Sequence, residues 1–237
     1  MEEKSTQIKR MFSSIAGRYD FLNHLSSMGM DLIWRARCAR EFSSLKGGFI
    51  LDVATGTADL AIEMARETSS AVKIIGVDFS EEMITLAKNK ITKKKLHDRI
   101  SFLICMAESL PFRDNVFDGC TIAFGIRNLP DRKAGLKEMY RVLKEDGHLL
   151  VLEFSRPAKK FFSTLYRFYS KYMLPFYGGI FSKRYAYEYL PASVENFPSR
   201  EKFKEMMKEC GFSQVQHCDM TFGIVTLYKG TKKKEGV

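Results

Sequence analysis

The stretch from residue 50 to residue 59, ILDVATGTAD, constrains the fold more than any other part of the chain. An apolar run reaches Asp52 and Val53, small residues follow, and an Ala/Leu/Ile/Met-rich helical pattern then begins. This order predicts a strand, a tight loop and a helix start. Gly56 allows a ligand to approach the main chain, and the first free N–H groups of the helix point into the same space. We therefore expect a ligand site at the end of this strand, with Asp52 facing the loop.

A second strand with an acidic end follows at Val72 to Asp78, VKIIGVD. In an open parallel sheet, an acid at the tip of the second strand is placed to bind ribose hydroxyls. The first loop lacks both the G-x-G-x-x-G pattern of NAD-binding proteins and the G-x-x-x-x-G-K-[ST] pattern of phosphate loops. A nucleoside without phosphates therefore fits the site better than a dinucleotide. A strand-loop-helix turn without any ligand is the alternative.

Strands and helices alternate through the rest of the chain. Apolar runs predict strands at 99–106, 117–124 and 147–154, and Ser80 is expected to cap a helix beginning at Glu81. Further helices are expected at 6–18, 31–45, 134–143 and 199–210, before a strand hairpin at 212–219 and 222–229. The alternation predicts an α/β fold with a parallel, doubly wound sheet.

The length of 237 residues suits a single α/β domain with additions. Within this one domain, 1–237, we expect four parts. These are an N-terminal helical cap at 1–46, a cofactor-binding core at 47–156, a helical substrate insertion at 157–198, and a closing helix and hairpin at 199–230.

Cysteine usage and hydropathy bear on the compartment. The five cysteines are odd in number and lack C-x-x-C spacing, so reduced thiols in the cytoplasm are expected. The charged first residues and the lack of any run of about 18 apolar residues predict a protein that is neither secreted nor membrane-spanning. The histidines and cysteines show no metal-ligand spacing, so no metal is expected.

The net charge of +10 is concentrated near the end of the chain. From residue 156 to 237 there are 15 basic and 7 acidic residues, and 12 of the 29 residues from 161 to 189 are Phe or Tyr. Basic charge mixed with aromatic rings suits RNA, by stacking and phosphate contact, or an anionic membrane surface with an apolar ligand. Solubility and core packing are the simpler explanations of the same residues.

Several ordered motifs narrow the function. The chain resembles the class I methyltransferases that use S-adenosylmethionine, whose sheet has seven strands. It is more specifically similar to the family of ubiquinone and menaquinone C-methyltransferases, on segments that span nearly the whole chain: ILDVATGTADL, GVDFSEEM, AESLPFRDNVFD, FGIRNLPD, RVLKEDGHLLVLEFSRP, YEYLPASVENFP and TFGIVTLYKG. The resemblance implies S-adenosylmethionine as cofactor and a prenylated quinol as substrate, demethylmenaquinol above all. It also implies a peripheral position at the inner face of the cytoplasmic membrane, without nucleic acid, and leaves a homodimer open.

The resemblance also assigns cofactor-binding positions. Thr57 matches the threonine of the family's GTGD loop, Asp78 matches its ribose-binding acid, and Met106 with Ala107 matches the pair beside the adenine.

Five positions depart from the family's pattern, and two of them are Glu145 and Asp146, which replace a Pro-Gly pair. Ala58 replaces the usual loop glycine and fits if its φ is negative, and Asp31 stands where the family generally has histidine. Met106 replaces Asp or Asn, so adenine recognition depends more on backbone groups.

Methylation of a ring carbon requires an ionised neighbouring hydroxyl. A free phenol has a pKa of about 10, so near pH 7 only roughly one molecule in a thousand is ionised. Arg127, just past the fourth strand, carries a fixed charge that could stabilise the phenolate, and Asn128 could orient the same oxygen. These two are the expected catalytic residues. An ordinary turn at GIRNLPD, with a surface arginine, is the alternative.

His24 lies with Tyr19, Asp20 and Asn23 in a polar segment expected to cover the cofactor pocket, although helix capping by Asp20 or Asn23 is an equal alternative. His148 opens a strand and is expected to be structural.

Two other functions of the whole protein are possible from the sequence. An RNA methyltransferase is favoured only by charge, and a non-catalytic nucleotide-binding module would have a decayed loop.

Overall fold

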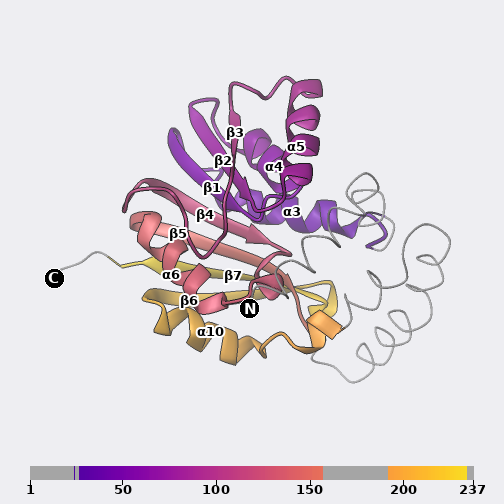
Figure 1. Cartoon of the computed structure of the whole chain (residues 1–237). Coiled ribbons are helices and arrows are strands. Elements are labelled where there is room, and N and C mark those ends of the chain that lie inside the picture. Colours follow the sequence, from indigo (N-terminus) through magenta and orange to yellow (C-terminus); the bar gives the residue numbers. More distant parts are fainter. Residues whose placement is uncertain (1–23, 25–26, 157–191, 234–237) are drawn as a thin grey trace.

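A mixed sheet of seven strands forms the centre of the computed structural model, which describes residues 24, 27–156 and 192–233 (Figure 1). The strand order is β3-β2-β1-β4-β5-β7-β6. Neighbouring strands from β3 to β5 are parallel, whereas β7 runs antiparallel to both β5 and β6. The α/β fold class expected from the sequence, a doubly wound seven-stranded sheet, is therefore confirmed.

The elements follow one another in the expected alternation. The strands are β1 Gly48–Val53, β2 Val72–Asp78, β3 Ile100–Ile104, β4 Phe117–Ala123, β5 Leu143–Phe154, β6 Phe212–Met220 and β7 Val225–Lys232. The helices are α3 Met30–Arg40, α4 Asp59–Glu67, α5 Glu81–Lys93, α6 Arg132–Val142 and α10 Arg200–Glu209, with short 3₁₀ turns η2 Ile126–Asn128 and η4 Thr221–Gly223.

Each central strand is buried on both faces, which explains its continuous apolar sequence. In β1, Ile50 and Leu51 are both fully buried but belong to two different apolar cores, because successive side chains point to opposite faces. Residues of α3, α4 and α5 complete the core that holds Ile50, and residues of α6 and α10 complete the core that holds Leu51 (Figure 1). Because helices cover both faces of the sheet, the ends of the strands remain as the place for a ligand.

Local signals in the sequence explain where helices begin and end. The Ser80 side chain accepts a hydrogen bond from the Met83 backbone N–H, as an N-cap does, which confirms the expected start of α5. Asp131 caps α6 in the same way, so that helix begins two residues earlier than expected. Gly211, with φ of 104°, follows α10, as predicted for the end of that helix.

Two strands begin three or more residues away from the expected position. Strand β5 begins at Leu143 rather than at residue 147, because Leu143 pairs with Phe117 before an irregularity in the register. The final hairpin turns at residues 221–223 with Phe222 at φ of 57°, so β7 begins at Val225 rather than at residue 222. Both shifts come from strand pairing, which depends on distant residues.

The expected N-terminal helix at 6–18 and most of the aromatic insertion lie outside the described residues. Among the residues that are described, no helix combines the length and the apolar character needed to cross a membrane.

Candidate active site

The carboxyl ends of β1, β2 and β4 surround an open cleft of about 780 Å³. Its walls come from the loops that follow these strands and β3. The loops after β1 and β4 approach closely, since a Cβ on Gly125 would lie 2.7 Å from the Cβ of Ala54. The residues around it are Val53, Ala54, Gly56, Val77, Asp78, Phe79, Met83, Cys105, Met106, Ala107, Glu108, Ala123, Phe124, Gly125, Asn128, Leu129 and Pro130.

The loop between β1 and α4 turns sharply through left-handed backbone conformations. Ala54, Gly56 and Ala58 have φ values of 52°, 56° and 71°. The condition under which Ala58 was expected to fit, a negative φ, is therefore not met. The turn into α4 requires a left-handed residue there, and for alanine this conformation costs roughly 1–2 kcal/mol. A Cβ at Gly56 would meet nothing within 4 Å, so this residue leaves the main chain open to the cleft.

Asp78 lines the cleft and holds two loops together. One carboxylate oxygen accepts the Gly56 N–H at 2.9 Å and the other accepts the Ser80 N–H at 3.0 Å. Burial raises the pKa of Asp78, although these backbone N–H groups oppose the shift. The carboxylate oxygens have further lone pairs, so Asp78 can orient the glycine loop and still accept hydrogen bonds from a ligand.

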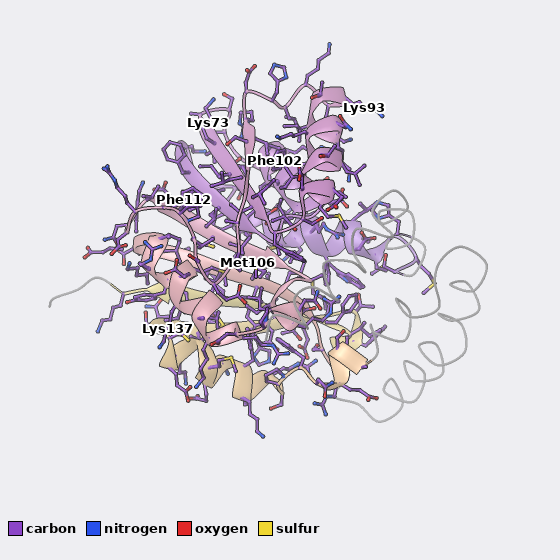
Figure 2. The ribbon with its side chains drawn as sticks, in the orientation of Figure 1. Lys73, Lys93, Phe102, Met106, Phe112 and Lys137 are labelled. Atoms are coloured by element: carbon purple, nitrogen blue, oxygen red, sulfur yellow. The ribbon has the colours of Figure 1, made fainter. Side chains whose placement is uncertain are left out.

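Met106 and Ala107 follow β3 and form another wall of the same cleft. Figure 2 shows Met106 in the middle of the view, between the part of the molecule that carries α5 and the part that carries α6. Its side chain is 39% exposed, whereas Ala107 is buried against Leu129 and other apolar residues of the second core. The pair therefore adds apolar surface to this wall of the cleft.

A smaller polar cavity of about 330 Å³ adjoins the cleft, and both include Ala54, Gly56 and Ala123. Its walls add Arg35, Asp52, Thr55, Thr57, Asp59 and Leu60. Basic and acidic side chains therefore line the same small cavity.

Asp52 is held within this smaller cavity by hydroxyl groups. Its carboxylate accepts hydrogen bonds from Thr55 Oγ1 at 2.6 Å and from Thr121 Oγ1 at 2.7 Å. Burial raises the pKa of Asp52 to about 6, while the two hydroxyls and the charge of Arg35 act in the opposite direction. Asp52 thus faces the loop, as expected, but at the smaller cavity rather than at the large cleft.

Thr57 also belongs to the smaller cavity. Its hydroxyl accepts a hydrogen bond from Lys90 Nζ at 3.1 Å, and the same ammonium contacts Asp59 Oδ1 at 2.7 Å. The loop after β1 is thereby attached to α5.

The structure separates the expected cofactor residues into two groups. Asp78, Met106 and Ala107 lie around the cleft, and Asp52 and Thr57 lie around the smaller cavity. Gly56 belongs to both.

Arg127 and Asn128 occupy different environments. Asn128 lines the cleft, but Arg127 is buried and forms an ion pair with Glu153, with Nη1 2.7 Å from Oε1. The Arg127 guanidinium also donates to the Phe124 carbonyl oxygen and, at 3.3 Å, to Ser193 Oγ. Its direct contact with a substrate remains a prediction, and these contacts give it a second role in holding the turn after β4.

Sequence reasoning missed two residues of this region, Arg35 and Glu153. Arg35 lines the smaller cavity and pairs with Asp31, four residues earlier on α3, a spacing that indicates neighbours on one helix face. Glu153 is fully buried at the end of β5. A carboxylate within the apolar run GHLLVLEF indicates a buried acid that needs a partner, so this signal was available.

Comparisons with known proteins identify the family. The sequence model of the ubiE/COQ5 methyltransferase family matches residues 1–232. The "Ubiquinone/menaquinone biosynthesis C-methyltransferase UbiE" of Geotalea uraniireducens is 50% identical over 232 residues, which cover 98% of this chain and 99% of the relative. The "Demethylmenaquinone methyltransferase" of Bacteroides fragilis is 44% identical over 231 residues, covering 97% and 94%.

Solved structures share the fold at much lower identity. The SAM-dependent methyltransferase of Aquifex aeolicus is 16% identical, with a TM-score of 0.65 over 90% of this chain and 97% of that one. The family follows from the sequence matches, which extend over nearly the full length. This chain therefore belongs to the ubiE/COQ5 methyltransferase family.

Proposed function

We propose that this protein transfers the methyl group of S-adenosylmethionine to a ring carbon of a prenylated demethylmenaquinol, giving menaquinol. The observation that carries the proposal is family membership over residues 1–232, together with relatives named as quinone methyltransferases. The precursor of ubiquinol is a second candidate substrate, because the relatives at 50% identity carry both quinones in their names. The paired cavities at the strand ends fit a ligand with an apolar ring system and a charged end.

The larger cleft suits the adenosine part of the cofactor. Asp78 would accept hydrogen bonds from the ribose hydroxyls, and Met106 with Ala107 would lie against the adenine. The smaller cavity suits the amino-acid part, since Arg35 can pair with a carboxylate and Asp52 with an ammonium group. Gly56 separates the two regions without a side chain, so one ligand can pass over it and reach both.

Thr57 is the remaining residue assigned to the cofactor. Its hydroxyl would support the amino-acid part from the loop while Lys90 and Asp59 keep that loop attached to α5. S-adenosylmethionine supplies a methyl group on a positively charged sulfur, which is ready for transfer to an electron-rich carbon. The protein must therefore provide that carbon, by ionising the neighbouring hydroxyl group and orienting the ring.

Asn128 would orient the quinol; its position in the lining of the cleft, at the carboxyl end of β4, supports this role. Arg127 is its neighbour in η2, and its ion pair with Glu153 fixes this turn. The guanidinium would stabilise the phenolate either directly or through the position of Asn128. Arg127 and Asn128 thus form the proposed catalytic pair.

We also propose peripheral contact with an anionic membrane, where a prenylated substrate is dissolved. Met28, Ile33 and Phe222 are exposed by 79%, 60% and 68%. They come from two neighbouring segments, because Trp34 Nε1 donates to Thr221 Oγ1 at 2.8 Å. The net charge of +10 favours an anionic surface beside these apolar side chains.

The reaction is tested with S-adenosylmethionine and reduced demethylmenaquinol in detergent, with the product identified by mass. A parallel reaction with the benzoquinol precursor of ubiquinol tests the second substrate. Methylation of neither quinol, by protein that binds S-adenosylmethionine in calorimetry, would overturn the proposal.

Membrane contact is tested by sedimentation with anionic and zwitterionic liposomes. Binding to the anionic liposomes should fall as salt rises, because the screening length is only about 8 Å at physiological ionic strength. The substitution Ile33→Asp should also weaken binding to the anionic liposomes. Binding to RNA but not to liposomes at low salt would contradict membrane contact and favour an RNA partner.

A further inference from the structure

A histidine and a buried carboxylate form a pair at the start of α3. His24 Nδ1 lies 2.8 Å from Asp31 Oδ2, and the same oxygen forms an ion pair with Arg35 Nη1. The other oxygen, Oδ1, accepts a hydrogen bond from Ser27 Oγ at 2.6 Å. Both carboxylate oxygens of Asp31 are therefore engaged by polar side chains.

Asp31 stays ionised in this setting. Burial acts to raise its pKa, but the hydrogen bond from Ser27, the charge of Arg35 and the contact with His24 outweigh burial and lower the pKa below its ordinary value. An ionised carboxylate only accepts hydrogen bonds, so the proton on the His24 ring must be on Nδ1. The lone pair of the neutral ring is then on Nε2, as in the histidines that act as general bases beside an aspartate.

Arg35 connects this pair to both cavities. Its side chain lines the smaller cavity, and its guanidinium lies 5.3 Å from the centre of the Phe124 ring, which lines the larger cleft. His24 and Arg35 contact the same oxygen of Asp31, so they are near neighbours in space. The His24 side chain is 36% exposed, which leaves the ring reachable by a substrate entering beside α3.

Four other ionisable groups, Asp52, Asp78, Cys105 and His148, are less suited to remove a proton here. The carboxylates of Asp52 and Asp78 already accept hydrogen bonds from the protein. Burial raises the pKa of Cys105 to about 11, so this thiol in the cleft wall holds its proton near neutrality. His148 pairs with Gly119 near the amino end of β4, away from the cleft.

We propose that His24 is the general base that removes the hydroxyl proton of the quinol, with Asp31 as the residue that positions it. The inference rests on the proposed function. His24 Nε2 takes the proton, and the electron pair of the O–H bond delocalises onto the ring carbon. That carbon forms its bond to the methyl group as the bond from methyl to sulfur breaks, leaving a neutral thioether. The ring carbon then loses its hydrogen as a proton to solvent water, which restores the aromatic ring as a phenolate. The phenolate oxygen takes back the proton from His24 Nε2, so the quinol and the neutral histidine are both regenerated.

The test compares full-length wild type with His24→Ala, and uses His97→Ala as a matched control. His97 also stands beside an aspartate, with Nε2 3.6 Å from Asp98 Oδ1, but it is exposed and precedes the amino end of β3. Turnover is measured with demethylmenaquinol, and cofactor affinity by calorimetry with S-adenosylmethionine. His24→Ala should lower kcat by about 10²-fold or more, the range of general base catalysis. Its cofactor affinity should stay within about twofold, and His97→Ala should match wild type.

Chemical rescue distinguishes a base from a structural residue. Added imidazole should restore part of the turnover of His24→Ala and leave His97→Ala unchanged. In the His24→Ala background, Asp31→Asn should lower kcat no further, because Asp31 acts through His24, and additive losses would assign Asp31 to structure. Wild-type turnover in His24→Ala, or a loss that imidazole cannot restore, would overturn the role of His24. If wild type itself methylates no quinol, the proposed function fails, and this role fails with it.

Discussion

Replacing Arg127 by methionine removes one partner of a buried ion pair and tests what this arginine does. Its guanidinium is 7% exposed and the Glu153 carboxylate is fully buried, with 2.7 Å between Nη1 and Oε1. Glu153 also accepts the backbone N–H groups of Arg127 and Phe154, at 3.2 and 2.8 Å. In Arg127→Met these N–H groups remain, but the carboxylate has lost its counter-charge.

The expected loss of stability follows from that uncompensated charge. Breaking a buried ion pair by removing one partner costs about 3–5 kcal/mol of unfolding free energy, whereas replacing both partners is often close to neutral. For a chain of this size, each kcal/mol corresponds to about 2–4 °C in Tm. Arg127→Met should thus lower Tm by roughly 10 °C, and adding Glu153→Gln should recover most of the loss. The glutamine keeps an acceptor for the two backbone N–H groups.

Thermal unfolding by circular dichroism measures these shifts, and quinol turnover is measured on the same samples below the lower Tm. Arg66→Met is the control, since Arg66 pairs with Glu63 at the surface and should change stability by less than about 1 kcal/mol. A Tm of Arg127→Met within 2 °C or so of wild type would refute the stabilising role of the pair. If the double variant regains Tm but not turnover, Arg127 acts in the chemistry. If the double variant regains both Tm and turnover, the role of Arg127 is to hold the turn after β4.

Three further outcomes are expected. Asp78→Ala should weaken S-adenosylmethionine binding about ten- to a hundredfold in calorimetry, the effect of losing a charge-assisted hydrogen bond, and unchanged affinity would remove Asp78 from the site. Burial raises the pKa of Asp52 from 3.8 to about 6, so its contribution to stability is full below pH 3.8 and disappears as pH rises through 6. In urea unfolding, the free energy of unfolding should therefore fall by up to about 3 kcal/mol between pH 4 and pH 7. This fall should be absent in Asp52→Asn. Ala58→Gly should raise stability by about 0.5–1 kcal/mol because it relieves a left-handed alanine, whereas Ala61→Gly within α4 should lower it. Equal effects in these two variants would contradict the strain at Ala58.

The sequence by itself determined the order of elements and the end of the sheet where a ligand binds. Apolar runs that end in Asp52 and Asp78 are local features, and so are the small residues of the first loop and the cap at Ser80. Each acts through neighbours only a few positions away. The family motifs added the reaction, because a long ordered set of segments identifies a family when a single glycine loop cannot.

The tertiary structure decided how those residues are used. Arg127 looks available in the sequence, yet the pairing of β4 with β5 places Glu153, 26 residues later, against its guanidinium. The pairing of β1 with β4 likewise brings Thr121 to Asp52, 69 positions apart. Sequence periodicity reports which face a side chain occupies, but not which strand lies beside it. Ion pairs and pKa shifts that involve two strands depend on that neighbour, so they become visible only in the fold.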